Sequence, residues 1–265
     1  MKLLRMLVAV LFAASAVLLG VSSVHQYLTT DRTYPTITCP ADTLSVSVAD
    51  GEDALLAGVT AYDEKDGDLT SEIMVDVALR GKGSAEVTYV VTDSDDHVAY
   101  AVRSLQYTDY EGIQFSLTSP LRYNLNSTVK LLDRLTAGDS VTGDLTDFIR
   151  VTANSFSTTV EGTYPVVFQV ANNIGDSATI TLDIEIRNTV SGEPVISLSD
   201  YIIYVEEGET VDPLSYVTEV KNGSVSNVKY TMPEGGLQTG TNQITLTCES
   251  DSGISGHTVL YVVVK

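Results

Sequence analysis

The sequence predicts an all-β protein made of three tandem β-sandwiches that follow an N-terminal transmembrane or signal helix. Three observations predict this class. A long apolar segment opens the chain, apolar and polar residues alternate along most later segments, and a pattern of strands recurs at intervals of about 80 residues. The composition agrees, because 14 Tyr and no Trp accompany many Val and Thr residues, which favour strands. The formal net charge of −20 excludes nucleic acid as a partner, since phosphates would be repelled.

The apolar segment runs from Leu3 to Val24, and Lys2 and Arg5 are the only Lys, Arg, Asp or Glu residues before residue 31. A helix of roughly 20 apolar residues spans a bilayer, whereas the apolar core of a signal peptide is about 7–15 residues long. We therefore expect residues 1–24 to be an uncleaved membrane anchor, with a signal peptide cleaved near Val21-Ser22-Ser23 as the alternative. Residues 25–34 then form a short stalk.

The charges predict the orientation of this segment. Basic residues flanking a spanning helix stay in the cytoplasm, so the acidic remainder is expected outside the cell. The predicted location is the cell membrane, crossed once, with the C-terminal bulk extracellular; the alternative is a secreted protein.

Three repeats follow, and we expect each to be one domain: residues 35–110, 111–189 and 190–265. They open with similar short strands at Ile37, Ile113 and Ile196. A late apolar strand recurs in all three, and a polar turn and a terminal strand follow it each time. These late strands are Val87–Val91, Val166–Val170 and Ile244–Cys248.

Period-two alternation identifies the strands of these repeats. Ala178, Ile180, Leu182, Ile184 and Ile186 alternate with polar residues, which is typical of a sheet with one buried face. Short strands at this spacing predict a sandwich, and no segment is long enough for the helical crossovers of a parallel sheet. We expect at most one helical turn per repeat, near 69–73, capped by Asp68.

The residues also resemble a known family. Residues 61–70, which read Ala-Tyr-Asp-Glu-Lys-Asp-Gly-Asp-Leu-Thr, and the later Tyr89–Asp93 are similar to bacterial immunoglobulin-like repeats of the type named after an insecticidal crystal protein. Hyaline-repeat and cadherin-like modules are similar too. The second repeat keeps Gly143-Asp144-Leu145-Thr146, and the third shares only the strand pattern. The resemblance implies an immunoglobulin-like sandwich in each repeat and says little about function.

Acidic residues gather at two turns of the first repeat. In an immunoglobulin-like topology these two turns lie at one end of the sandwich, so the carboxylates are expected to converge there. Calcium prefers six to eight oxygen ligands, which makes the cluster a candidate calcium site. The alternative is turn chemistry, in which Asp accepts hydrogen bonds from nearby amides and Gly supplies positive φ. The candidate ligands are Asp63, Asp66, Asp68, Asp93 and Asp95.

Cys39 and Cys248 lie in different repeats, so we expect two free thiols. His25, His97 and His257 lack the spacing of metal ligands. The sequence contains none of the nucleophile, phosphate-loop or zinc-protease motifs, so we expect neither an enzyme nor a bound organic cofactor.

These features predict a membrane-anchored surface protein that acts as a stalk or protein-interaction scaffold. The alternative is an adhesin or a carbohydrate- or cell-wall-binding module, which would need an exposed aromatic platform. Tyr100, Tyr107, Tyr110 and Tyr123 are the candidates for that platform, and packing within sheets is their other role. The expected partners are the membrane and either surface proteins or glycans.

Overall fold

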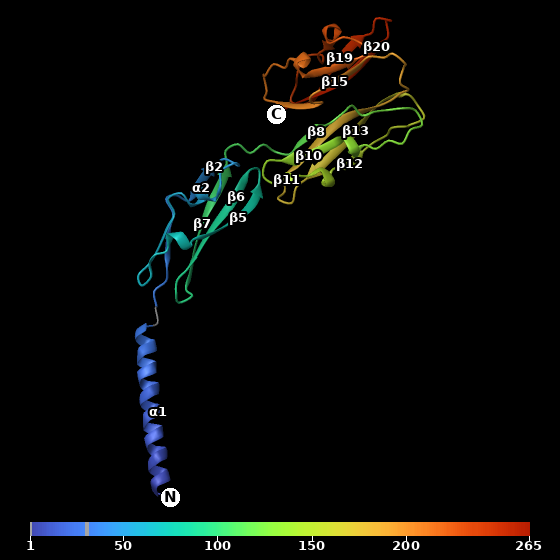
Figure 1. The fold of residues 1–265 in the computed structure, drawn as a ribbon. Helices are drawn as coiled ribbons and strands as arrows, with labels where there is room; N and C mark the ends of the chain where they lie inside the picture. Colours follow the sequence, from blue (N-terminus) through green and yellow to red (C-terminus); the bar gives the residue numbers. More distant parts are fainter. Residues whose placement is uncertain (1, 30–31) are drawn as a thin grey trace. The chain divides into compact units, whose positions relative to one another are not determined.

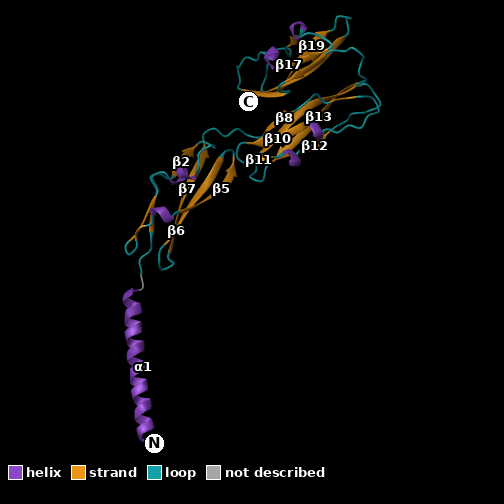
Figure 2. Ribbon diagram, in the orientation of Figure 1, coloured by secondary structure: helices purple, strands orange, loops and turns teal. Residues whose placement is uncertain are grey.

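The structure, a computed structural model, describes residues 2–29 and 32–265. The chain divides into two compact units. The first contains residues up to 79 together with 84–108, and the second contains residues 80–83 together with 109–265. Apart from the N-terminal helix and several single helical turns, both units are built of β-strands joined by loops and turns (Figures 1 and 2). The predicted all-β class is therefore confirmed.

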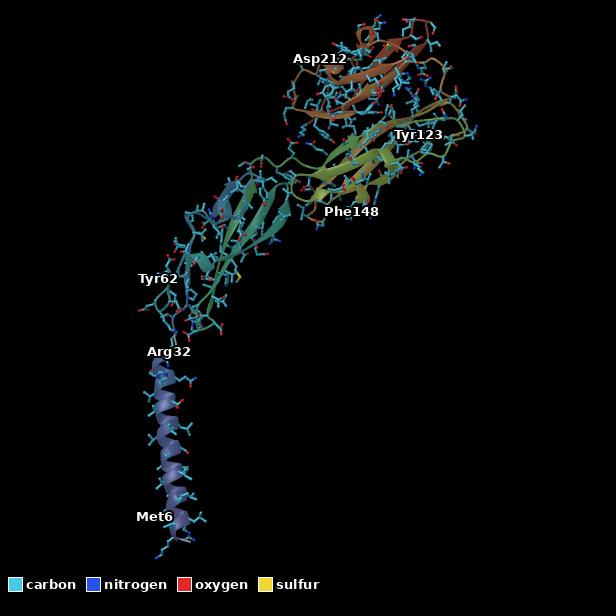
Figure 3. The ribbon with its side chains drawn as sticks, in the orientation of Figure 1. Met6, Arg32, Tyr62, Tyr123, Phe148 and Asp212 are labelled. Atoms are coloured by element: carbon cyan, nitrogen blue, oxygen red, sulfur yellow. The ribbon has the colours of Figure 1, made fainter. Side chains whose placement is uncertain are left out.

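The N-terminal helix α1 (Lys2–Thr29) begins the chain. Within its segment Lys2–Tyr27 the most apolar stretch of 18 residues has a mean hydropathy of 2.4, and none of that stretch is buried inside the protein. Apolar side chains, Met6 among them, project from it along its length (Figure 3). By length and composition the helix can cross a membrane, and a signal sequence would have the same properties.

Two sheets build the rest of the first unit. The strand order is β1-β3-β4 in one sheet and β2-β7-β6-β5 in the other. β3 pairs antiparallel with β1 and β4, β6 pairs antiparallel with β7, and β2 pairs parallel with β7. The strands are β1 (Thr36–Thr38), β2 (Thr43–Val46), β3 (Thr60–Asp63), β4 (Gly67–Asp68), β5 (Met74–Gly81), β6 (Ser84–Thr92) and β7 (Val98–Tyr107).

The second unit contains four sheets. Their strand orders are β11-β10-β8, β12-β13-β14-β9, β15-β17 and β16-β20-β19-β18. The strands in the second repeat are β8 (Gln114–Leu117), β9 (Arg122–Tyr123), β10 (Leu135–Asp139), β11 (Gly143–Asp144), β12 (Arg150–Ala153), β13 (Gly162–Ala171) and β14 (Ser177–Ile186). Those in the third are β15 (Val195–Leu198), β16 (Ile202–Val205), β17 (Val217–Lys221), β18 (Lys229–Thr231), β19 (Gly240–Glu249) and β20 (Ser255–Val264).

One connection recurs in all three repeats. The opening strand pairs antiparallel in one sheet, and the next short strand crosses to the other sheet, where it pairs parallel with the terminal strand. The parallel pairs are β2 with β7, β9 with β14 and β16 with β20. This shared topology agrees with the repeat that the sequence predicts.

Short helices are more frequent than we expected. The predicted turn near 69–73 is present as η1 (Thr70–Glu72), and Asp68 Oδ1 accepts a hydrogen bond from the Thr70 amide at 2.9 Å. Each repeat also has a second short helix, so the expectation of at most one helical turn was wrong. In the first repeat it is α2 (Glu52–Leu56), whose acidic first turn suits a helix N-terminus. The others are η2 (Leu132–Arg134), η3 (Thr146–Phe148), η4 (Pro213–Tyr216) and η5 (Val225–Asn227).

The late strands supply the centre of each core. Tyr89, Phe168 and Leu246 hold equivalent places and are fully buried. Cys248 is buried beside them, at the place that Val91 and Val170 hold, as the repeat alignment predicts.

The buried residues of the described chain form two clusters. One cluster lies in the first unit, and the other is continuous through residues 113–264. The third repeat packs on the second, where the Phe115 amide donates to the Tyr204 hydroxyl at 2.6 Å.

Candidate functional site

The acidic residues of the first repeat lie in two turns that meet. Asp66 reaches the later turn, where its carboxylate accepts hydrogen bonds from the Ser94 amide at 2.9 Å and the Ser94 hydroxyl at 2.8 Å. Lys65 pairs with Asp95 across the same gap. The two turns therefore converge at one end of the sandwich, as the topology predicted.

Three carboxylate oxygens in this cluster accept hydrogen bonds from backbone amides of their own turn. Asp63 Oδ1 accepts from the amides of Lys65 at 2.8 Å and Asp66 at 3.0 Å. Gly67, at φ +80°, closes this turn in a conformation that other residues rarely adopt. Asp68 bonds Thr70, which holds the pKa of Asp68 below its ordinary value. These contacts are the turn chemistry that we gave as the alternative to calcium.

In the later turn, Asp93 accepts hydrogen bonds from turn amides as Asp63 does in the earlier one. Its Oδ1 accepts from the amides of Asp95 at 2.9 Å and His97 at 2.7 Å, and its Oδ2 lies 2.8 Å from His97 Nδ1. Burial opposes ionisation, but the hydrogen bonds from His97 and Asp95 outweigh it and lower the pKa of Asp93. Within residues 2–29 and 32–265, no group of three or more His, Cys, Asp or Glu side chains is placed so that it could hold a metal ion. Calcium binding stays a prediction.

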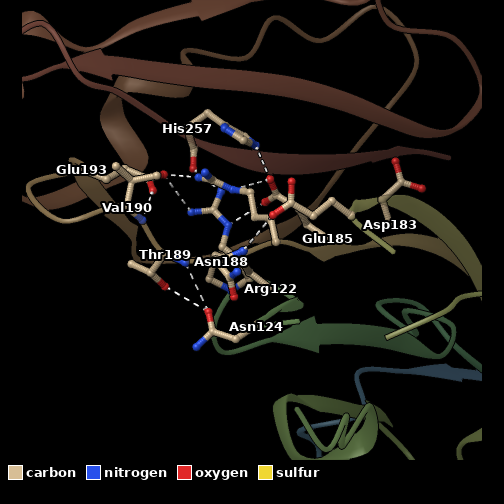
Figure 4. A network of polar contacts seen from close by, with 12 residues as sticks. Arg122, Asn124, Asp183, Glu185, Asn188, Thr189, Val190, Glu193 and His257 are labelled. Atoms are coloured by element: carbon tan, nitrogen blue, oxygen red, sulfur yellow. Dashed lines mark hydrogen bonds and ion pairs between the residues drawn. The ribbon is translucent and has the colours of Figure 1, made fainter. Parts of the chain in front are cut away.

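A network of charged side chains lies in the second unit, where the third repeat packs on the second (Figure 4). Arg122 on β9 is at its centre. Its Nε lies 2.6 Å from Glu185 Oε2 on β14, and its Nη2 donates to the backbone oxygen of His257 on β20 at 2.8 Å. Arg187 pairs with both Glu185, at 2.7 Å, and Glu193. The network thus links strands of both repeats with the segment between them.

The charges in this network balance, because two arginines face two glutamates. Glu193 is 4% exposed and also lies 3.6 Å from Arg122 Nη1. Burial opposes ionisation of Glu185, but His257 and Arg122 outweigh it, and the pKa of Glu185 falls to about 2. A buried carboxylate remains charged only with such partners, so the network ties its members firmly together.

A small polar cleft of about 240 Å³ lies beside the network. Its lining includes Asp183, Gln243, Thr245, His257 and Tyr261. The Gln243 amide donates to Asp183 Oδ2 at 2.9 Å, and the Asp183 amide donates to the Tyr261 hydroxyl at 2.9 Å. The cleft therefore presents hydroxyl, amide and carboxylate groups together, between strands of both repeats.

The four tyrosines proposed as an aromatic platform have different surroundings. Tyr123 is buried, and Tyr107 packs against the core of the first unit. Tyr110 donates its hydroxyl to Asp176 at 2.7 Å, and burial together with that carboxylate raises the pKa of Tyr110. Tyr100 is 75% exposed. Packing therefore accounts for Tyr107 and Tyr123, and Tyr62, also exposed (Figure 3), was not among the candidates.

The remaining candidates from the sequence are the cysteines and two of the histidines, and their environments are as follows. Cys39 and Cys248 are both free, as expected. His97 binds Asp93, and His257 Nε2 lies 3.4 Å from Glu185. The Arg122 network was not predicted from the sequence.

No protein-family model matches the chain. The chain is 30% identical over 164 residues to the pesticidal crystal protein Cry22Aa of Bacillus thuringiensis, a match that covers 60% of this chain and 22% of that protein. This similarity agrees loosely with the resemblance to crystal-protein-type repeats. The chain therefore spans about a fifth of the length of the relative it matches.

The solved structures that align with this chain have little sequence identity to it. The mouse cadherin-23 fragment EC22-24 is 14% identical at a TM-score of 0.21, and the alignment covers 88% of this chain and 99% of that one. The Clostridium perfringens ZmpB fragment, described as CBM51-2 in complex with GlcNAc and INT domains, is 15% identical at a TM-score of 0.23, covering 87% and 42%. Superpositions this poor support no conclusion about the arrangement or function of the chain.

Proposed function

We propose that the chain is a membrane-anchored surface protein whose three immunoglobulin-like domains, at residues 35–110, 111–189 and 190–265, act as a stalk or protein-interaction scaffold. Helix α1 is the observation that carries this proposal. All of its described side chains are exposed, so its apolar surface needs either a bilayer or removal by a signal peptidase. Lys2 and Arg5 hold its start in the cytoplasm, and the acidic β-units face outward.

Protease shaving of intact cells tests this topology, combined with N-terminal sequencing of the membrane fraction. We expect peptides from residues 32–265 to be released while the helix stays with the membrane and keeps its N-terminus. A mature protein that begins near Val24 and is found in the medium would show secretion instead. Capture of surface proteins by the intact chain then tests the scaffold role.

The second candidate is carbohydrate binding, which the polar cleft of the second unit favours. Sugar hydroxyls both donate and accept hydrogen bonds, and the cleft offers both kinds of partner, for example Gln243 and Asp183. Its volume of about 240 Å³ suits a single sugar ring better than a longer glycan. A glycan array with Gln243→Ala as the comparison tests this candidate, which requires binding that the variant loses.

A further inference from the structure

We propose that the first repeat binds one hard divalent cation, of the calcium class, at the buried oxygen Asp63 Oδ2. Asp93 and Asp66 supply the further carboxylates. The site lies between the turn after β3 and the turn after β6, and it is independent of the surface role proposed above.

Asp63 carries the first observation. Asp63 is 1% exposed, and its Oδ1 accepts hydrogen bonds from two backbone amides. Its Oδ2 is also buried, but it has no hydrogen-bond partner within the described part of the chain. A buried carboxylate oxygen without a donor is costly, because desolvation is not compensated. A cation is one of the few groups that can complement it.

The second repeat shows how the same position is normally completed. Asp139 is the equivalent of Asp63: each ends its strand, and each pairs with the glycine of the following Gly-Asp. Asp139 Oδ1 also accepts two turn amides, but its Oδ2 accepts from the Asn172 side-chain amide at 3.2 Å and from the Thr142 hydroxyl. Both oxygens of Asp139 therefore have donors.

The first repeat has lost both of those donors. Asn172 corresponds to Asp93, since each caps the same late turn by accepting hydrogen bonds from amides two and four residues ahead. Thr142 corresponds to Asp66. Two positions that supply donors to Asp139 Oδ2 in the second repeat thus carry carboxylates in the first. This exchange removes two hydrogen-bond donors and adds two negative charges, which is the change that a cation site requires.

The chemistry of these oxygens selects the cation. Carboxylates with carbonyls and water are the ligands of calcium, which accepts irregular geometry, whereas magnesium requires a near-ideal octahedron. Asp66 faces Ser94 and Asp93 faces His97, so a cation competes with those donors. We therefore expect weak binding, with a dissociation constant on the order of 0.1–1 mM, as in extracellular modules.

Two of the five carboxylates singled out in the sequence are not part of this site. Asp68 is exposed and accepts from its own Thr70 amide, and Asp95 pairs with Lys65. Asp68→Asn is therefore a matched control, because it removes one negative charge from the same turn without touching the proposed ligands.

The experiment uses the full chain in detergent micelles with calcium as the probe. Thermal unfolding and amide hydrogen exchange are measured with calcium and with sodium chloride of equal ionic strength. At about ten times the dissociation constant, calcium should raise the Tm of the first unit by roughly 6–11 °C and slow exchange in residues 63–70 and 92–97. Asp93→Asn should lose the response, and without calcium it should be at least as stable as the parent, because its amide can donate to Asp63 Oδ2. Asp68→Asn should keep the response.

Three results would overturn the proposal. The first is a calcium effect that sodium chloride reproduces, since that is general screening of an acidic protein. The second is a specific effect that Asp93→Asn retains. The third is unchanged exchange at residues 63–70 in the unaltered chain, a measurement that requires no variant to fold.

Discussion

Replacing Arg122 with Met should destabilise the second unit more than any other single loss of charge at its surface. The arginine makes two close polar contacts, with Glu185 at 2.6 Å and with the His257 backbone oxygen at 2.8 Å, and a longer one with Glu193. Hydrogen bonds to charged groups contribute about 1.5–3 kcal/mol each. The Arg122 side chain is 24% exposed, so solvent screening reduces the total to about 2–3 kcal/mol. Met retains the packing of the aliphatic stem.

Urea unfolding of the full chain in micelles measures this change, with tyrosine fluorescence as the signal. Urea is preferable to guanidinium, whose salt would screen the charges under test. The expected loss corresponds to a Tm about 5–10 °C lower. Lys130→Met is the control, since Lys130 is largely exposed and pairs with Asp133 at 3.6 Å, and it should cost less than about 0.5 kcal/mol. Equal effects of the two variants would refute a structural role for the network.

Three further predictions concern the second unit. The Thr258 hydroxyl is buried without a partner in the described chain, so Thr258→Val should raise the free energy of unfolding by about 1 kcal/mol in urea titrations. The pKa of Glu185 is depressed to about 2, so its contribution is complete above about 4.5 and falls as pH drops towards 2. Discounted for partial exposure, the loss is about 2 kcal/mol, and Glu185→Gln should flatten this part of the stability–pH profile. A Cβ on Gly256 would lie 2.0 Å from the Pro194 oxygen, so Gly256→Ala should cost about 2 kcal/mol or more, whereas Gly112→Ala, in open space, should be nearly neutral by thermal melting.

Alternation predicted the strands well because it reports a local property, the burial of one face. Along β6 and the second half of β13 every second residue is buried, Tyr89 and Phe168 among them. The short helix α2 was missed because Asp50-Gly51-Glu52-Asp53 has the composition of a turn. Ala54, Leu55 and Leu56, which follow these four residues, pack on the core of the first unit. This tertiary contact stabilises the segment as a helix.

The acid cluster was predicted in part. Topology placed the two turns together correctly, since that depends only on the order of strands. Which oxygens remain without donors could not be read from the residues, because Asp63 and Asp139 look equivalent in the sequence. Their difference arises from Asp93 and Asn172, about 30 residues further along each repeat, and became visible only when both turns were in place.

The packing of the third repeat on the second had a sequence signal that alternation obscures. Residues 259–264, at the end of the last strand, are apolar without interruption, and so are residues 201–205. Such runs are typical of strands buried on both faces. In the structure Leu260 and Val262 point into the core while Tyr261 contacts Asp183 of the second repeat.

The equivalent strand in the first repeat behaves differently. In β7 the outward residues Val98, Tyr100 and Val102 are about half or more exposed. The outward face of the terminal strand is thus exposed in the first repeat and mostly half-buried or buried in the third, although the two repeats have the same topology. If the chain is a surface scaffold, residues 109–265 should respond to force or protease as one block, because the contacts between their repeats include buried charges that separation would leave without partners. Unfolding of the third repeat alone would separate the buried Glu193 from Arg122 and Arg187 and would separate His257 from Glu185, which the burial of Glu193 makes unfavourable.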